Sequence, residues 1–128
     1  MLNTNIHKGK REEASLELVE TIAQIIYNKA GKNIFAIDIR NVSTLCDFCI
    51  VAEGTVDRHV RAIAKTIEEE LSLLGHKPSR MEGLQEGNWA ILDYLNVMIH
   101  ILTPSFREKY HLERLWEEGT IIDLNFTE

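Results

Sequence analysis

The chain has 128 residues, a formal net charge of −6 and two cysteines. This length predicts a single domain with enough core to fold without a metal or a disulfide. The acidic balance argues against a protein that coats nucleic acid, because phosphate binding needs clustered Lys and Arg, but it permits a basic protein partner. No apolar run is long enough to span a bilayer and the first residues are polar, so we expect a cytoplasmic protein with reduced thiols.

The first half of the chain predicts a helix followed by two strands. Residues 1–11 are polar and are predicted to form a flexible tail. Apolar residues recur at three- and four-residue steps over residues 12–29, which predicts a helix that Gly31 ends. Alternation over residues 34–39 predicts a strand with one buried face. Residues 48–52 are apolar on both faces, so we expect a central strand there.

The second half begins with a long helix. An apolar stripe predicts that this helix covers residues 55–74. Residues 76–86 are polar and are predicted to be a loop. Aromatic and β-branched residues then fill 89–94 and 97–102, and Asn96 favours a tight turn between them. These two segments therefore predict a β-hairpin.

A last helix is predicted after the hairpin, with Thr103 as its N-cap and Pro104 in its first turn. Its predicted anchors are Phe106, Tyr110, Leu115 and Trp116. These anchors share one stripe only loosely, so the helix is expected to break near His111.

The expected order is α-β-β-α-β-β-α. It predicts one mixed α/β domain over residues 12–119, with helices packed on a sheet of four or five strands and a C-terminal tail over 120–128. If strands 48–52 and 89–94 are parallel neighbours, the helix between them makes a right-handed crossover.

Metal and redox sites have little support. Cys46 and Cys49 form a C-x-x-C, but the motif runs into a strand and no second Cys or His pair follows. A core cysteine and a loop cysteine are the favoured interpretation. His100 stands on an apolar strand and is more readily explained as a satisfied core or edge histidine than as a ligand or base. We therefore expect no metal and no cofactor.

Catalytic motifs are equally weak. The stretch Glu53-Gly54-Thr55 resembles a strand–glycine–helix phosphate cradle, but it lacks both common glycine-rich frames, so a plain helix cap by Thr55 is favoured. No two aspartates stand one residue apart to hold a pair of metal ions, and no G-x-S-x-G elbow occurs. These observations favour a protein that is not an enzyme.

The hairpin holds the best candidates for binding. Trp89 follows a polar loop, and the sequence favours a core position and an interface position for it about equally. Asp93 interrupts an apolar run, and a buried carboxylate needs a partner or water. A strand end that faces a turn or a partner would explain it.

Several motifs agree, in order, with one known family. Together the matching segments resemble the ribosomal silencing factor (Iojap-like) family over nearly everything from Leu16 to Trp116. The segments are residues 47–54, 57–64, 82–83, 87–94, 97–101 and 107–116.

The resemblance implies a fold related to nucleotidyltransferases without their catalytic acids. It implies binding to the fourteenth protein of the large ribosomal subunit, at the face where the small subunit docks. Occupancy there would block subunit joining and repress translation when nutrients are limiting. It also implies self-association of the free protein, with no sequence-specific nucleic-acid binding and no membrane.

The family's contact surface centres on a W-x-x-x-D-Y-G-D strand and turn. Carried over to this sequence, the expected partner-binding residues are Trp89, Leu92, Asp93, Tyr94 and Asn96. The sequence departs from the family motif in the turn itself. Leu95 stands where the family has Gly, and Asn96 where it has Asp.

Two other functions stay open at this point. One is a nucleotidyltransferase-like enzyme that uses Asp93 and the turn at Gly54 and Thr55 on a nucleotide. The other is a homodimeric adapter without ribosome binding, with its sheet edge as the contact.

Overall fold

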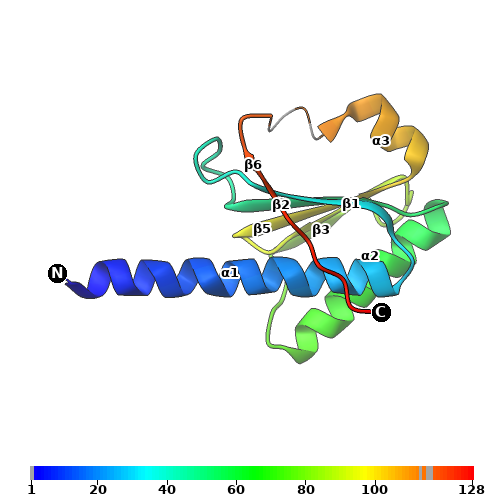
Figure 1. Ribbon diagram of the computed structural model, residues 1–128. Helices are drawn as coiled ribbons and strands as arrows, with labels where there is room; N and C mark the ends of the chain where they lie inside the picture. Colours follow the sequence, from blue (N-terminus) through cyan, green and yellow to red (C-terminus); the bar gives the residue numbers. More distant parts are fainter. Residues whose placement is uncertain (1, 113, 115–116) are drawn as a thin grey trace.

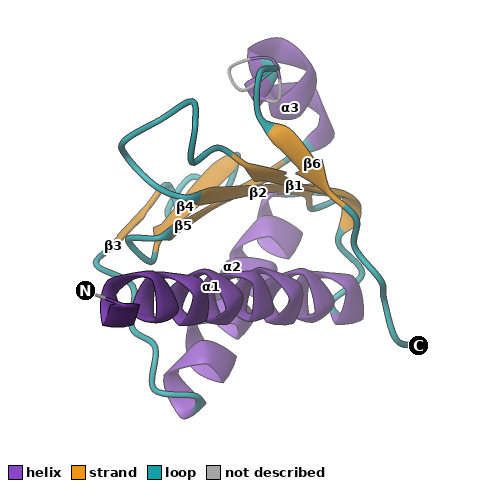
Figure 2. Cartoon of the chain, turned by 60° about the vertical axis from the view of Figure 1, so that its left-hand side comes forward, coloured by secondary structure: helices purple, strands orange, loops and turns teal. Residues whose placement is uncertain are grey.

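A three-layer arrangement places the candidate residues on one central sheet. The computed structural model describes residues 2–112, 114 and 117–128, with side chains from Glu13 onward. In this part of the chain a six-stranded sheet has the order β3-β4-β5-β2-β1-β6. Helices α1 (Leu2–Asn28) and α2 (Asp57–Leu73) cover one face, and α3 (Pro104–Tyr110) lies on the other (Figure 1, Figure 2). The predicted mixed α/β class is confirmed.

The strands pair in a mixed pattern. Their bounds are β1 Lys32–Asp38, β2 Phe48–Glu53, β3 Arg80–Glu82, β4 Trp89–Asp93, β5 Val97–Leu102 and β6 Thr120–Ile122. The parallel neighbour of β2 is β5, so the condition of a parallel pair between strands 48–52 and 89–94 is not met, and the other pairings are antiparallel. β5 is buried at five of its six positions, whereas β4 alternates between half-buried and buried residues. A strand covered on both faces belongs beside another of the same kind, so β5 pairs with β2, which is also buried at five of its six positions.

Two strands were not predicted. β3 lies in the segment assigned to a loop, and β6 in the segment assigned to the C-terminal tail. Each has three residues, which is too short for a period-two pattern to stand out. The predicted count of four or five strands is therefore low.

The helix ends differ from the prediction in three places. α1 begins at Leu2 rather than at residue 12, and the flexibility expected of residues 1–11 stays a prediction. α2 begins at Asp57 after Val56, so Thr55 is not its cap. α3 ends at Tyr110 because His111 adopts a left-handed backbone, which confirms the expected break. The predicted anchors Leu115 and Trp116 lie outside the described residues.

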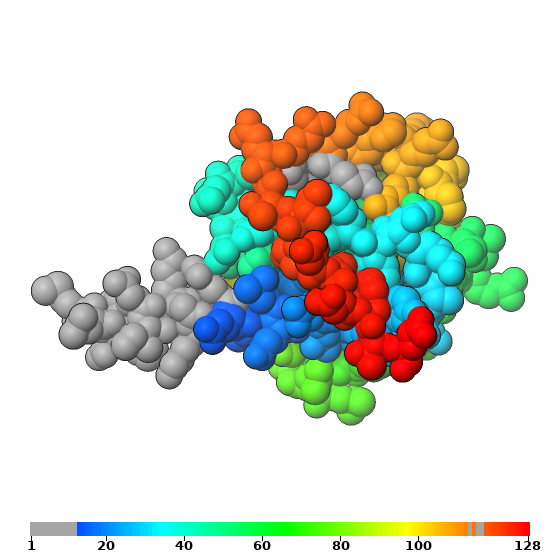
Figure 3. Space-filling view, in the orientation of Figure 1, coloured from blue at the N-terminus to red at the C-terminus, as the bar shows by residue number. Residues whose placement is uncertain are grey.

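The C-terminal residues pack onto α1 and β1. Tyr27 and Phe126 stack with ring centroids 4.7 Å apart. Gln24 exchanges two hydrogen bonds with the backbone of Thr127, at 2.8 and 2.9 Å. Figure 3 shows this segment, in red, running across the body of the molecule. β6, which follows residue 119, pairs with β1. The division of the chain into a domain and a tail at residue 119 stays a prediction.

The two faces of the sheet carry separate apolar cores. Under α1 and α2 the core includes Phe48, Ile50 and Ile99, all fully buried. On the α3 side a smaller cluster holds Cys49 and Val51. The alternation along each strand decides which core a side chain enters. The face of a β4 residue therefore decides whether it can meet a partner.

Candidate partner-binding surface

Strand alternation separates the predicted partner-binding residues. Leu92 and Tyr94 point toward α1 and α2, where Leu92 is fully buried and Tyr94 is 8% exposed. Trp89 and Asp93 lie on the opposite face and are half-buried. Asn96 is exposed in the turn after β4. The structure thus brings Trp89 and Asp93 to one face and leaves Leu92 and Tyr94 in the core.

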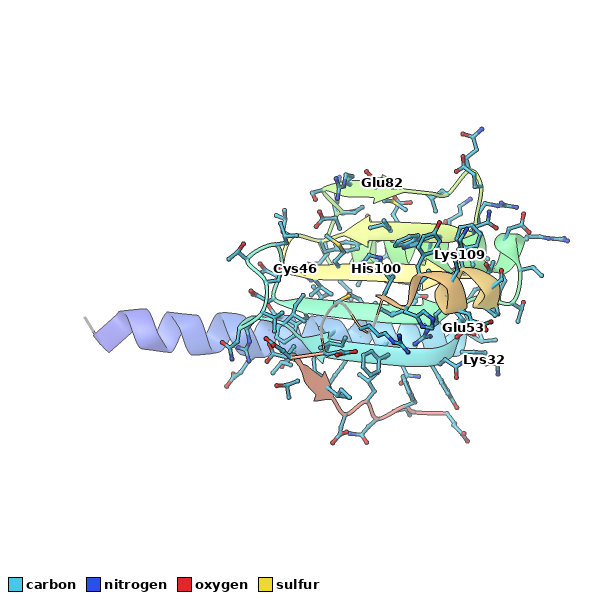
Figure 4. All side chains as sticks on the ribbon, turned by 90° about the horizontal axis from the view of Figure 1, so that it is seen from above. Lys32, Cys46, Glu53, Glu82, His100 and Lys109 are labelled. Atoms are coloured by element: carbon cyan, nitrogen blue, oxygen red, sulfur yellow. The ribbon has the colours of Figure 1, made fainter. Side chains whose placement is uncertain are left out.

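The face that carries Trp89 is open above β3 and above β4 beyond Trp89 itself, which packs against Tyr110 of α3. Viewed from the α3 side, no helix of the described residues lies over β3, and Glu82 marks the free edge of the sheet (Figure 4). The residues gathered here are half-buried or exposed and mostly apolar. We call Trp89, Ile91, Asp93, Met98 and Tyr110 the β4 surface. The sequence-based prediction does not include Ile91 or Met98, although period-two alternation along the hairpin groups Ile91 with Trp89 and Asp93.

Trp89 is fixed by contacts on two sides. Its indole Nε1–H donates to His100 Nδ1 at 3.1 Å, and its ring lies 5.0 Å from that of Tyr110. His100 is 5% exposed, and burial lowers its pKa to about 4. The unprotonated Nδ1 that accepts this bond therefore belongs to a neutral imidazole. Trp89 is consequently both a packed residue and part of the surface.

Asp93 ends β4 and shapes the turn. Its Oδ1 accepts a hydrogen bond from the backbone N–H of Leu95 at 2.8 Å. Its Oδ2 lies 3.9 Å from Arg80 Nη2, and the Asp93 side chain keeps 19% of its surface exposed. The expectation that this carboxylate faces a turn at a strand end is confirmed. Oδ1 of Asp93 therefore fixes the backbone of the turn, and the carboxylate remains partly exposed to solvent.

The turn after β4 carries an unusual backbone. Leu95 has φ +70°, in the left-handed region that non-glycine residues rarely adopt. The turn closes because Tyr94 N–H donates to Val97 O at 2.9 Å. Asn96 O accepts from the backbone of Asp47 and Phe48, which joins the turn to the start of β2.

Gly83 sets the path of the backbone into β4. It has φ +78°, and a Cβ added there would lie 1.8 Å from the Trp89 carbonyl oxygen. Gly83→Ala is expected to lower the free energy of unfolding by about 2–3 kcal/mol, because it combines backbone strain with a backbone clash. Urea unfolding measures this loss.

Gly75→Ala is the matched control for that substitution. Gly75 has φ +89°, but nothing lies within 4 Å of an added Cβ. Gly75→Ala should lower the free energy of unfolding by about 1 kcal/mol, because it adds only the strain of a left-handed backbone. Equal losses at the two positions would show that the clash with Trp89 has no effect.

Comparison with known proteins identifies the family. Residues 12–128 match the family model described as "Ribosomal silencing factor during starvation". The chain belongs to the ribosomal silencing factor family. A relative with that name from Bacillus subtilis is 31% identical over 77% of this chain and 84% of its own length. Another from Haemophilus influenzae is 31% identical over 79% of this chain and 99% of its own length.

Solved structures agree with this assignment. A crystal structure of a Chromobacterium violaceum protein superposes with a TM-score of 0.78 at 28% identity, covering 85% of this chain and 90% of the other. The silencing factor named from that organism is 30% identical over 82% of this chain and 83% of its own length. These relatives are named for a regulatory role rather than an enzymatic one.

The nucleotide-binding alternative finds no support at Gly54 and Thr55. Thr55 N–H, an amide that a phosphate would need, donates to His59 Nδ1 at 2.8 Å. His59 Nε2 therefore carries the proton and donates to Lys29 O at 2.7 Å. A Cβ on Gly54 would lie 2.8 Å from Val60 N, so glycine allows α2 to pack closely here. In this chain the turn ties α2 to the end of α1.

Both cysteines are buried thiols. Burial, with the charges of Asp93 and Asp47, raises the pKa of the Cys46 thiol to about 11, so the thiolate that redox chemistry needs is disfavoured. Within the described residues, no group of three His, Cys, Asp or Glu side chains could hold a metal ion. None of the helices in the described part is long and apolar enough to cross a membrane.

Proposed function

We propose that this protein binds the large ribosomal subunit through its fourteenth protein and prevents the small subunit from joining. The observation that carries the proposal is the β4 surface, where an ordered Trp and a partly exposed carboxylate share an open sheet face. Membership of the silencing factor family supports the ribosome as the target. Translation would fall when nutrients are limiting, as the family description indicates.

The mechanism is steric and requires no covalent step. A bound domain of this size occupies space that the small subunit needs. Aromatic side chains at the centre of a contact supply much of the binding free energy, and the acidic charge of −6 favours a basic partner. Nanomolar binding corresponds to about 12 kcal/mol. The site of action is then the cytoplasm, and recognition is of a protein surface rather than of a nucleic-acid sequence.

Sedimentation of ribosomal subunits tests the proposal. Purified protein is mixed with large subunits, small subunits are added, and the mixture is separated on a sucrose gradient. The protein is expected to travel with the large subunit and to reduce the fraction of joined particles. Unchanged joining, with all of the protein remaining at the top of the gradient, would refute the proposal.

Asp93→Asn tests the charge on the β4 surface. The amide oxygen keeps the acceptor for Leu95 N–H, so the turn is retained while the negative charge is removed. Affinity for large subunits is expected to fall about 10- to 30-fold, because a charge pair with the basic partner is lost. A binding titration at two salt concentrations measures it, and the variant should show the weaker salt dependence.

The control is Asp123→Asn. Asp123 is exposed just after β6, at the sheet edge opposite β3. Asp123→Asn removes one negative charge far from the β4 surface and should leave the affinity for large subunits almost unchanged. If both variants weaken binding equally, overall charge rather than Asp93 determines the affinity.

A further inference from the structure

Two leucines stand exposed at the end of the sheet where β4 stops. Leu45 is 82% exposed in the loop before β2, and Leu95 is 68% exposed in the turn after β4. The two segments are joined because Asn96 O accepts hydrogen bonds from Asp47 N–H and Phe48 N–H, at 2.9 and 3.0 Å. Figure 4 shows Cys46, next to Leu45, at this same end of the sheet. Leu45 and Leu95 therefore belong to one end of the molecule.

Leu95 is costly for the fold and contributes little to it. Its φ of +70° places a branched side chain in a backbone conformation that glycine adopts without strain. The side chain is mostly in solvent, so burial within the chain does not offset that cost. A strained residue that packs so little within its own fold points to a contact outside it.

Carboxylates flank this apolar pair. Asp47 follows Leu45 by two residues, and Asp93 precedes Leu95 by two. Asp47 N–H donates to Asn96 O in the turn where Asp93 Oδ1 accepts from Leu95 N–H, which places both residues at the same end of the sheet. Asp93 also belongs to the β4 surface, so the leucines continue that surface beyond the strand end. Apolar residues with an acidic rim suit a partner that offers an apolar patch bordered by Lys or Arg.

We propose that Leu45 and Leu95, flanked by Asp47 and Asp93, form a second part of the docking surface and bind an apolar patch with a basic border on the ribosomal protein. This inference rests on the proposed function and adds the residues that determine how tightly this particular chain binds. The occupant is the same basic protein that meets the β4 surface, because Asp93 belongs to both parts. The cost of the Leu95 backbone is then recovered on binding.

Leu95→Gly gives a test with two opposite readouts. Relief of the left-handed strain should raise the melting temperature of the free protein. Loss of the leucine side chain should weaken binding to purified large subunits by about ten-fold. A merely structural residue would not gain stability and lose affinity together. Leu45→Ala, which leaves the backbone alone, should also weaken binding about five- to ten-fold with no change in melting temperature.

Leu73→Ala is the matched control. Leu73 is 87% exposed at the end of α2, beside Glu69 and Lys77 and away from the turn. It should bind large subunits as the unmodified chain does. Equal weakening by Leu73→Ala would overturn the proposal, because any exposed leucine would then have the same effect.

A fourth variant separates this inference from the proposed function. Ile91→Ser changes the β4 surface itself and should weaken binding whether or not the leucines take part. If Ile91→Ser loses affinity while Leu95→Gly and Leu45→Ala bind normally, the second docking part is refuted and the proposed function stands. If the unmodified protein does not bind large subunits, both fail.

Discussion

Replacing Trp89 with Ala is expected to lower the free energy of unfolding by about 3–4 kcal/mol. The indole packs against Tyr110 at 5.0 Å, and its N–H donates to His100 at 3.1 Å. The substitution leaves a cavity in the smaller core and leaves His100 Nδ1 without the donor that Trp89 provides. The free-energy costs of the cavity and of the lost hydrogen bond add. Urea unfolding at neutral pH measures the loss.

Trp89→Phe is the control for that result. It keeps an aromatic ring beside Tyr110 and removes the indole N–H, so it should cost only about 1 kcal/mol. The difference between the two variants reports the packing of the ring. An Ala variant as stable as the unmodified chain would show that Trp89 is a surface residue alone. Binding by the Ala variant should be measured only where the variant is folded.

The sequence predicts the interior of this fold better than its edges. The central position of residues 48–52 follows from a run that is apolar on both faces, and β2 is buried at five of its six positions. The stripe that begins at Val60 likewise predicts the buried face of α2. β3 and β6 pair through three residues each, and such short strands depend on neighbours that a local pattern does not contain.

The candidate site shows the same division. Alternation alone separates Leu92 and Tyr94 from Trp89 and Asp93, yet a motif carried over as one string had grouped them. The partner of Trp89 could not be predicted, because the bond to His100 depends on the register between β4 and β5. The junction of Asn96 with Asp47 depends on the parallel pairing of β5 with β2, which the hairpin sequence does not specify.

Acidification is expected to destabilise the fold through His100. Burial lowers its pKa to about 4 in the folded state, against about 6.5 in the unfolded chain. Above about pH 6.5 both states hold a neutral imidazole, and the full stability is present. As the pH falls below that value, the unfolded chain binds a proton that the folded chain does not, so unfolding becomes more favourable. The expected loss is about 2 kcal/mol between pH 7 and pH 5, and about 3 kcal/mol by pH 4.

His100→Asn isolates this contribution. The Asn side chain does not titrate, and its amide oxygen can accept the indole N–H in place of Nδ1. The variant starts from lower stability because it leaves a gap in the core, but its stability should change much less between pH 7 and pH 5. His76→Asn, at an exposed position after α2, should keep the full pH dependence. All other titratable groups except His76 are the same in the three proteins, so the comparison isolates the contribution of His100. If His100→Asn retains the slope of the unmodified chain, the imidazole is protonated in the folded state and cannot accept the Trp89 bond as described.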